Sequence, residues 1–276
     1  MSLQLGKHQK MAASDLAKSK ALPSIELEYK GPLDWPFMLS FYQRRAIKHI
    51  ESVDENSYSR HAFLNDKPIW FRLTQSRPQS LTLEYDVASD RELKPLIAKL
   101  RRMLDLDADI DAIEAHLKAA EPDLIKRTGI RIPGVWSSWE AGVRAVLGQQ
   151  VSVTAAITHL NRLTEQLTDL TQFPSPELVA SADLSFLKMP QRRKDSLSAL
   201  ANFVVKHPSA SPSEWLAIKG IGPWTVQYVQ LRGLSEQDCF LSGDLVVKKA
   251  LAHFARLNEN TAHPYGSYAT FHLWNQ

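Results

Sequence analysis

The 276-residue sequence is poor in the features that mark several protein classes, beginning with cysteine, of which Cys239 is the only one. One thiol excludes an intramolecular disulfide framework, a zinc–cysteine cluster and an all-cysteine iron–sulfur cluster. No apolar run approaches the ~18–20 residues that span a bilayer. Met1–Lys20 also lacks the apolar segment of a secretory signal. We therefore expect an intracellular, cytoplasmic protein with no membrane partner.

A large net charge is missing as well, since the formal net charge is only +3. The chain has 33 basic and 30 acidic residues, and the excess lies within residues 1–20, predicted to be a flexible basic arm. The whole-chain basic excess that is typical of nucleic-acid binding is therefore absent. Yet residues 186–256 carry ten basic and five acidic residues, while residues 103–123 carry seven acidic and one basic. Residues 21–276 are thus formally neutral because basic and acidic segments cancel each other.

Alternating apolar and polar residues predict a small N-terminal α/β domain with an antiparallel sheet over residues 21–88. Ile25–Tyr29 has the pattern of a half-buried strand, and residues 36–50 have that of a helix. Further strands are predicted at 58–64, 69–74 and 80–87, with a turn around Pro78 between the last two.

The rest of the chain is predicted to be helical. Ser89 and Glu92 have the spacing of a capping box, which predicts a helix from residue 89 to about residue 106. Further helices are expected within 136–168, at 177–182 and at 191–206. We divide this part into a segment 89–125 that packs with the C-terminal helices, a central domain 126–232 and a C-terminal part 233–276. The predicted fold class is mainly α with a small α+β N-terminal domain.

The segment Gly220-Ile-Gly-Pro223 is the most informative motif. Two glycines around one apolar residue allow a tight turn between helices, and Pro223 suits the first position of the second helix. Ile221 can pack between the two helices. Backbone N–H groups at the new helix start are free to hold a phosphate. On this motif alone, an ordinary turn between two helices and a phosphate-binding hairpin are about equally probable interpretations.

Asp244 follows a glycine and precedes a helical run, so it is a natural N-cap. For an isolated aspartate this structural role is the more frequent one. A cap and a catalytic carboxylate are nevertheless compatible, because a helix N-terminus stabilises a negative charge.

These motifs resemble the helix-hairpin-helix DNA glycosylase superfamily, in which the hairpin grips DNA phosphates and an aspartate about 20 residues later is essential. Gly222 and Asp244 have that spacing, and the segment Trp139–Ser152 resembles the helix that lines the base cleft. Segments around Asp34-Trp35 and at Pro264-Tyr265 resemble the alkylation-repair branch, DNA-3-methyladenine glycosylase II. The likeness implies an active-site cleft between two helical domains.

The resemblance implies an enzyme that flips a damaged base out of duplex DNA and hydrolyses its N-glycosidic bond. Asp244 would stabilise the positive charge that develops on the sugar. The base pocket would consist of Trp224, Tyr228, Trp274 and Phe41. Glycosylases of this superfamily that also cleave the strand have a lysine where this chain has Trp224. We therefore expect a monofunctional hydrolase of 3-methyladenine-type bases that starts base excision repair and leaves an abasic site.

The resemblance also implies the contacts with DNA. The hairpin at Gly220, Ile221 and Gly222 would hold phosphate, and the expected DNA-binding side chains are Thr225, Gln150 and Lys248. Gln150 stands where the family inserts an apolar wedge. Carbonyls of Leu216, Ile218 and Gly220 would hold a monovalent cation, Na⁺ or K⁺, that is structural, and no other cofactor and no iron–sulfur cluster is expected.

The predicted partner is damaged double-stranded DNA, bound by a monomer that in a bacterium would associate with the nucleoid. Few phosphate contacts should make the salt dependence of binding modest, and deletion of the arm should spare catalysis. Two alternatives remain open. One is a glycosylase for deaminated or oxidised bases, and the other is a noncatalytic helix-hairpin-helix DNA-binding module.

Overall fold

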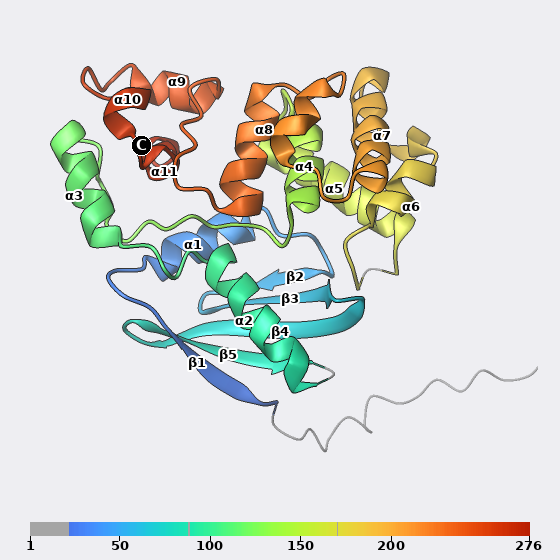
Figure 1. Cartoon of the computed structure of the whole chain (residues 1–276), viewed down its shortest axis with the longest axis horizontal. Helices are drawn as coiled ribbons and strands as arrows, with labels where there is room; N and C mark the ends of the chain where they lie inside the picture. Colours follow the sequence, from blue (N-terminus) through green and yellow to red (C-terminus); the bar gives the residue numbers. More distant parts are fainter. Residues whose placement is uncertain (1–21, 88, 170) are drawn as a thin grey trace, which may run out of the picture.

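The computed structural model describes residues 22–87, 89–169 and 171–276. An antiparallel sheet forms one end of the molecule and helices form the other (Figure 1). The predicted fold class, mainly α with a small α+β N-terminal unit, is confirmed. The basic arm predicted for residues 1–20 lies outside the described residues.

The sheet has five antiparallel strands in the order β1-β5-β4-β3-β2. They are β1 (Ser24–Glu28), β2 (Glu51–Val53), β3 (Ser57–Leu64), β4 (Lys67–Arg77) and β5 (Ser80–Asp86). In β4, Phe71 and Leu73 are buried and Arg72 between them is exposed, so the sheet is half-buried, as the alternation predicts. The predicted turn around Pro78 joins β4 to β5.

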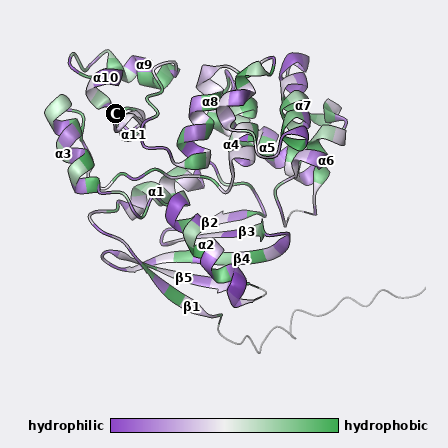
Figure 2. Cartoon of the chain, viewed as in Figure 1, coloured by the Kyte–Doolittle hydropathy of each residue, from purple (hydrophilic) through white to green (hydrophobic). Residues whose placement is uncertain are grey.

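Two helices cover the buried face of the sheet. These are α1 (Trp35–Gln43) and α2 (Asp90–Met103), and Met38 of α1 and Leu100 of α2 share one core cluster with the strands. Figure 2 shows the outer side of α2 as mostly hydrophilic. The predicted capping box differs in detail, because the Glu92 carboxylate accepts from the Ser89 hydroxyl and pairs with Lys67 at 2.6 Å.

The helix predicted over residues 36–50 ends early, at Gln43. Ile47 and Ile50 turn away from the sheet and are buried in a second core, around α4 (Ser138–Gly148). The short strand β2 that follows was not predicted. Tertiary packing of two isoleucines thus outweighs the helical pattern of this segment.

Residues 89–125, expected to pack with the C-terminal helices, divide between two cores. Helix α2 belongs to the core of the sheet, whereas Ile113 and Leu117 of α3 (Ile110–Ala120) pack with the C-terminal helices. Those helices are α9 (Leu245–Leu251), α10 (Glu259–Ala262) and α11 (Gly266–Trp274).

The remaining helices surround the second core with α4. They are α5 (Val153–Leu167), α6 (Pro176–Ser181), η1 (Leu184–Phe186), α7 (Gln191–Lys206), η2 (Pro212–Ala217), α8 (Pro223–Val229) and the π-helical η3 (Gln230–Leu234). The predicted helix 191–206 matches α7. In the part of the chain that the structure describes, no helix has the length and apolar character to cross a membrane.

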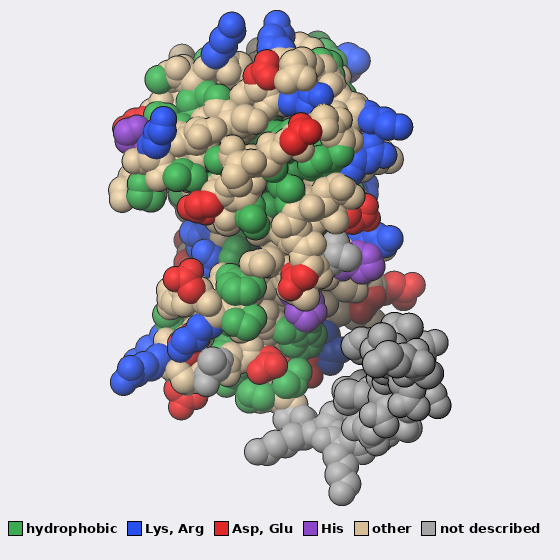
Figure 3. Space-filling view, turned by 90° about the vertical axis from the view of Figure 1, so that its right-hand side faces the viewer, with side chains coloured by type: hydrophobic (Ala, Val, Ile, Leu, Met, Phe, Trp, Pro, Cys, Tyr) green, Lys and Arg blue, Asp and Glu red, His purple; other side chains and the backbone are tan. Residues whose placement is uncertain are grey.

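The charged segments of the sequence are partly separated in space. Helix α3, in the acidic segment, and α7, in the basic segment, lie at opposite ends of the helical body (Figure 1). Figure 3, which looks onto the side that carries α6 and α7, shows Lys and Arg side chains projecting from the helical half. Helix α9, which carries Lys248 and Lys249 of the same basic segment, lies at the α3 end, and the Arg256 N–H donates to Glu121 of the acidic segment at 3.2 Å.

Candidate active site

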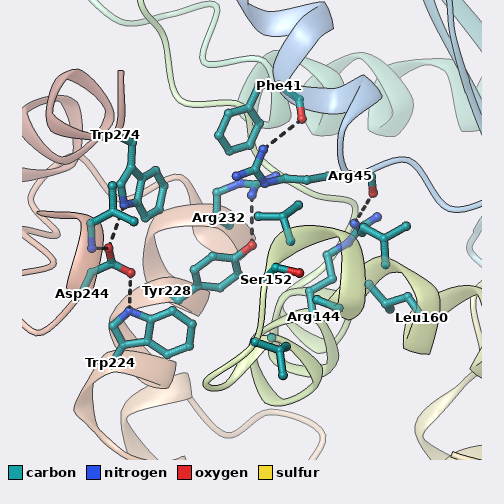
Figure 4. Close-up of a pocket in the computed structure, with 16 residues that line it drawn as sticks. Phe41, Arg45, Arg144, Ser152, Leu160, Trp224, Tyr228, Arg232, Asp244 and Trp274 are labelled. Atoms are coloured by element: carbon teal, nitrogen blue, oxygen red, sulfur yellow. Dashed lines mark hydrogen bonds between the residues drawn. The ribbon is translucent and has the colours of Figure 1, made fainter. Parts of the chain in front are cut away.

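A cavity of about 290 Å³ opens between the central helices and the C-terminal helices. The end of α1, the α4–α5 connection, α8 with η3, the start of α9 and the end of α11 all contribute to its walls (Figure 4). All five residues predicted for catalysis and base binding line it, namely Phe41, Trp224, Tyr228, Asp244 and Trp274. The fold thus brings together side chains from three distant parts of the sequence.

Asp244 caps α9, as predicted, and also bonds to two indoles. Its Oδ1 accepts from the N–H groups of Val246 at 2.9 Å and Val247 at 3.1 Å. Trp274 Nε1 donates to the same oxygen at 3.1 Å, and Trp224 Nε1 donates to Oδ2 at 3.1 Å. Four N–H donors therefore surround one carboxylate, an arrangement that complements a negative charge and fixes both indole rings.

Two of the aromatic side chains that form the walls of the cavity stack on each other. Trp224 and Tyr228, one helical turn apart on α8, have ring centroids 5.4 Å apart and planes inclined by 28°. Trp274 lies across the carboxylate from them (Figure 4). These three residues are only partly buried, so their rings are accessible to a flat aromatic ligand.

Phe41 departs from its predicted role as an open stacking face. Its side chain is 3 % exposed, and the guanidinium carbon of Arg45 lies 3.7 Å from the ring centroid. The guanidinium of Arg232 lies 4.7 Å from the same centroid. Protein cations thus already occupy the cation–π positions on this ring, and Phe41 forms the wall behind them.

Three arginines that line the cavity were not predicted from the sequence. Arg144 pairs with Glu51 and Glu140, each at 2.8 Å. Arg232 donates from Nη1 to the Tyr228 hydroxyl at 3.1 Å. A signal for Arg45 was present, since it follows Phe41 by four residues in a segment predicted to be helical.

Arg45 is the arginine of the cavity with the fewest partners. Its Nη1 donates to the Phe41 carbonyl at 3.3 Å, and its own carbonyl accepts from Arg144 Nη1 at 2.7 Å. Among the described residues, no carboxylate lies within ion-pair distance of it. Burial away from water, followed by the charge of Arg232, lowers the pKa of Arg45 to about 9, so the guanidinium is still protonated at neutral pH.

The predicted hairpin connects η2 to α8. Gly220 has φ of +91°, and a Cβ there would lie 2.0 Å from Ser196 Oγ, so only glycine fits. Gly222 has φ of −110° and open space around its Cα, so neither its backbone conformation nor its surroundings require glycine. Ile221 is buried in the central core, as predicted, and its N–H donates to the Ile218 carbonyl at 3.0 Å.

The other predicted DNA contacts differ in exposure. In the described part of the chain, the N–H groups of Gly220 and Gly222 have no hydrogen-bond partner, and Lys248 is exposed on α9. Gln150 is exposed beside the cavity, in a left-handed conformation with φ of +58°. Thr225 is 2 % exposed, so it supports the hairpin from inside, contrary to its predicted contact with DNA.

The preceding glutamine connects the cavity to the hairpin. Gln149 Nε2 donates to the Gly220 carbonyl at 3.1 Å and to Thr225 Oγ1 at 3.2 Å. It thereby fastens the end of α4, which precedes the exposed Gln150, to the turn whose N–H groups are free. Sequence reasoning did not find this link.

Two of the three carbonyls predicted to hold a monovalent cation, those of Ile218 and Gly220, have acceptor capacity left. Ile218 O accepts one hydrogen bond, from the Ile221 N–H, and Gly220 O accepts one from Gln149. Each carbonyl oxygen has two lone pairs, so each retains one for an ion. Among the described residues, no group of three or more His, Cys, Asp or Glu side chains could hold a metal ion.

A hairpin with free N–H groups, followed by a carboxylate at an aromatic cavity, defines the class of helix-hairpin-helix DNA glycosylases. Solved structures share this fold. The chain aligns with a 3-methyladenine DNA glycosylase from Archaeoglobus fulgidus at a TM-score of 0.76 and 17 % identity, over 91 % of this chain and 97 % of that one. It aligns with the structure of MBOgg1 in complex with a low-affinity DNA ligand at 0.69 and 18 %, over 91 % and 94 % of the two chains.

Sequence comparison narrows the class. Residues 24–137 match the family model of the AlkA N-terminal domain. The chain is 30 % identical to DNA-3-methyladenine glycosylase 2 of Escherichia coli strain K12, over 90 % of this chain and 95 % of that protein. It is 33 % identical to a probable bifunctional transcriptional activator/DNA repair enzyme AlkA of Mycobacterium tuberculosis, over 91 % of this chain and 56 % of that longer protein. The chain belongs to the DNA-3-methyladenine glycosylase 2 (AlkA) family.

Proposed function

We propose that the protein is a monofunctional DNA glycosylase that removes alkylated bases of the 3-methyladenine type from duplex DNA and leaves an abasic site. The observation that carries this proposal is the Asp244 carboxylate, held by both indoles at the wall of the cavity. Membership of the AlkA family supports the same activity. In the cell, this reaction would be the first step of base excision repair.

Asp244 would act on the sugar of a flipped nucleotide. As the C1′–N bond lengthens, positive charge develops on the deoxyribose, and a nearby carboxylate stabilises it. Water then bonds to C1′ and loses a proton, and the electron pair of the broken bond leaves with the base. A base alkylated on a ring nitrogen carries a positive charge and leaves as a neutral molecule.

The aromatic rings would select such a base by stacking. Trp224, Tyr228 and Trp274 present accessible faces, and cation–π attraction contributes roughly 0.5–2 kcal/mol per ring. No lysine is among the described residues that line the cavity, and the hairpin position is Trp224. The described lining therefore offers no lysine amine that could form a Schiff base with the sugar. This supports hydrolysis without strand cleavage.

Duplex DNA would bind across the mouth of the cavity as a ligand of one protein molecule. The free N–H groups of Gly220 and Gly222 suit a phosphate, and Lys248 adds a positive charge. Gln150, exposed next to the cavity, would enter the gap left by the flipped nucleotide. Sedimentation or light scattering at micromolar concentration should give the mass of a monomer, and the DNA substrate implies work inside the cell, on the nucleoid in a bacterium.

We also propose that a monovalent cation at the carbonyls of Leu216, Ile218 and Gly220 supports the hairpin. It would supply positive charge beside the bound phosphate. Replacing K⁺ or Na⁺ by a bulky organic cation at constant ionic strength should weaken DNA binding several-fold. Equal affinity in all three salts would contradict this part of the proposal.

The test of the activity is base release from methylated duplex DNA. The wild-type protein should release 3-methyladenine, and Asp244→Asn should lower the single-turnover rate by two orders of magnitude or more, because the neutral amide cannot stabilise the developing charge. Asp195→Asn, which removes one negative charge at an exposed position of α7, is the matched control and should retain the wild-type rate.

Each alternative predicts a different result in the same assay. DNA binding without release of any base from a panel of lesions would favour a noncatalytic binding module. Release of only deaminated or oxidised bases would reassign the lesion. Full activity of Asp244→Asn would remove that residue from the reaction, and a borohydride-trapped adduct with DNA would contradict the hydrolase without lyase activity.

A further inference from the structure

Four exposed aliphatic side chains gather at the mouth of the cavity. Among the described residues, Leu245 and Val246 at the start of α9 are the most exposed large apolar side chains, at 65 % and 53 %. Val151 and Val153, in the α4–α5 connection and at the start of α5, are exposed as well, and both line the cavity, as does Val246. Single exposed apolar residues are ordinary, but a group of them around the opening of a site indicates a surface that a ligand covers.

The four side chains stand on two sides of the opening. Figure 4 shows Asp244, which precedes Leu245, and Ser152, which stands between the two valines, on different sides of the cavity. Val246 is part of the cavity wall, whereas the more exposed Leu245 is not. Leu245 therefore stands at the rim, with its side chain in solvent outside the cavity.

The exposed residues one turn further along α9 are basic. Lys248 and Lys249 follow Leu245 by three and four positions, so the three side chains share one side of the helix. Proteins that open the minor groove of DNA combine the same two kinds of side chain, since an apolar residue enters a base step and cations hold the phosphates. The start of α9 thus has the chemistry of a surface that opens a DNA duplex.

We propose that Leu245 is a wedge residue that enters the base step beside the flipped nucleotide on the damaged strand, while Val246 packs against the sugar of that nucleotide. This inference rests on the proposed glycosylase function, because duplex DNA is the ligand. The strand follows from the order of residues: Asp244 would act at the sugar of the flipped nucleotide, and consecutive Cα atoms are only about 3.8 Å apart. Leu245 is therefore held next to that sugar.

Leu245 and Gln150 would open the duplex by different means. The Gln150 amide, exposed on the other side of the opening, can hydrogen-bond to the base left without a partner, but it gains little by leaving water. A leucine side chain has no polar group to satisfy, so its insertion removes apolar surface from water and offsets the stacking that the two bases lose. Leu245 thus stabilises the opened duplex and contributes little to the binding of a fully stacked one.

The experiment measures binding to two duplexes of the same sequence, one with a tetrahydrofuran analogue of an abasic nucleotide and one undamaged. Leu245→Ala should weaken binding of the first duplex about tenfold, the loss expected when a leucine side chain is no longer buried, and should change binding of the second by less than about twofold. Leu245→Met, which keeps the length and apolar character, should bind both duplexes as the wild type does. Leu178→Ala, which shortens an exposed leucine on α6, far from α9 in Figure 1, is the matched control and should leave both affinities unchanged.

A fluorescent base reports the wedge directly. The fluorescence of 2-aminopurine rises when the base is unstacked, so it is placed in the damaged strand on one or the other side of the abasic analogue. At one of these two positions the wild-type protein should raise the fluorescence several-fold, and Leu245→Ala should not. Equal fluorescence with both proteins at both positions would overturn the inference.

Other outcomes separate this inference from the function on which it rests. Unaltered affinity of Leu245→Ala for both duplexes would overturn the inference, whereas release of 3-methyladenine by the wild-type protein would show that the proposed function stands. Equal loss of affinity for both duplexes, or a lowered urea midpoint of Leu245→Ala, would assign the residue to general contact or to the fold and would also overturn it. If the wild-type protein bound neither duplex and released no base, the proposed function would fail and the inference with it.

Discussion

At the scale of single residues, the carboxylate of Asp244 combines structural and chemical roles. It caps α9 through two backbone N–H groups and holds two tryptophans through their indole nitrogens. Each role uses the same negative charge. An aspartate that looks like an ordinary helix cap in the sequence can therefore be the centre of a site, and only the fold reveals which donors converge on it.

A second acidic residue, Asp105, has a measurable effect on stability. It is buried, and desolvation outweighs its bonds from the Ile132 N–H and the Tyr268 hydroxyl, which raises its pKa to about 6. The folded protein then binds a proton at Asp105 more tightly than the unfolded chain does. Its contribution to stability is greatest at low pH and is lost as the pH rises from about 4 to about 6.

Asp105→Asn should therefore stabilise the protein at pH 7.5, by up to about 2–3 kcal/mol, because the amide keeps an acceptor oxygen and carries no charge. Asparagine also tolerates the φ of +55° at this position. Urea unfolding of both proteins should show the gain shrinking between pH 6 and pH 4. The comparison cancels the opposite trend of His272, whose pKa burial lowers to about 4. A gain that did not depend on pH would contradict the assignment.

At the scale of elements, the hairpin shows why its two glycines are not equivalent. Gly220 is required by its positive φ and by Ser196, whereas nothing in the described chain crowds Gly222. Because neither the backbone conformation nor the packing of the protein requires glycine at this position, its presence indicates a ligand that needs close access to the backbone.

The pair Gly220→Ala and Gly222→Ala tests this difference. Gly220→Ala should lower the free energy of unfolding by about 2 kcal/mol or more, from backbone strain and the contact with Ser196. Gly222→Ala should change it by less than about 0.5 kcal/mol, yet weaken DNA binding through steric obstruction of the phosphate. Denaturant unfolding and DNA-binding titrations measure both effects. Equal destabilisation, or unaltered binding by Gly222→Ala, would argue against the hairpin as a phosphate site.

The elements also show how far the sequence predicts the fold. Local patterns are sufficient for α7 and for four of the strands, because apolar periodicity and turn residues act at short range. They fail where distant contacts decide, as at residues 44–53, where Ile47 and Ile50 join the core around α4. For the site, the family resemblance found Asp244 and the aromatic residues but not Arg144 or Arg232, because Glu51 and Phe41, which contact these arginines, lie in distant parts of the chain.

At the scale of the whole molecule, a buried group of charges joins the sheet to the cavity. Arg60 on β3 pairs with Glu140 on α4 at 2.5 Å, and Arg144, one turn along α4, lines the cavity. Coulombic attraction from Arg60 and Arg144 overcomes desolvation and lowers the pKa of Glu140 to about 2. The small N-terminal unit is thus part of the wall of the site and more than an accessory to it.

Glu140→Gln should therefore destabilise the entire protein by roughly 3–5 kcal/mol, because it leaves two buried guanidinium groups short of a partner. The matched variant is Glu84→Gln, which breaks the pair with Arg72 on the exposed face of the sheet and should cost less than about 1 kcal/mol. Denaturant midpoints of the two variants provide the measurement. A similar small loss in both would indicate that the buried group does not hold the two parts together.

The two indoles that share one carboxylate have a consequence for how the enzyme would discriminate among bases. A base too large for the cavity would have to displace Trp224 or Trp274, and the displaced ring would take its N–H donor away from Asp244. Poor fit would then slow the cleavage of the bond and not only weaken binding. In such an arrangement an undamaged base can enter the cavity and leave it without being cleaved, because the enzyme distinguishes bases by the rate of bond cleavage.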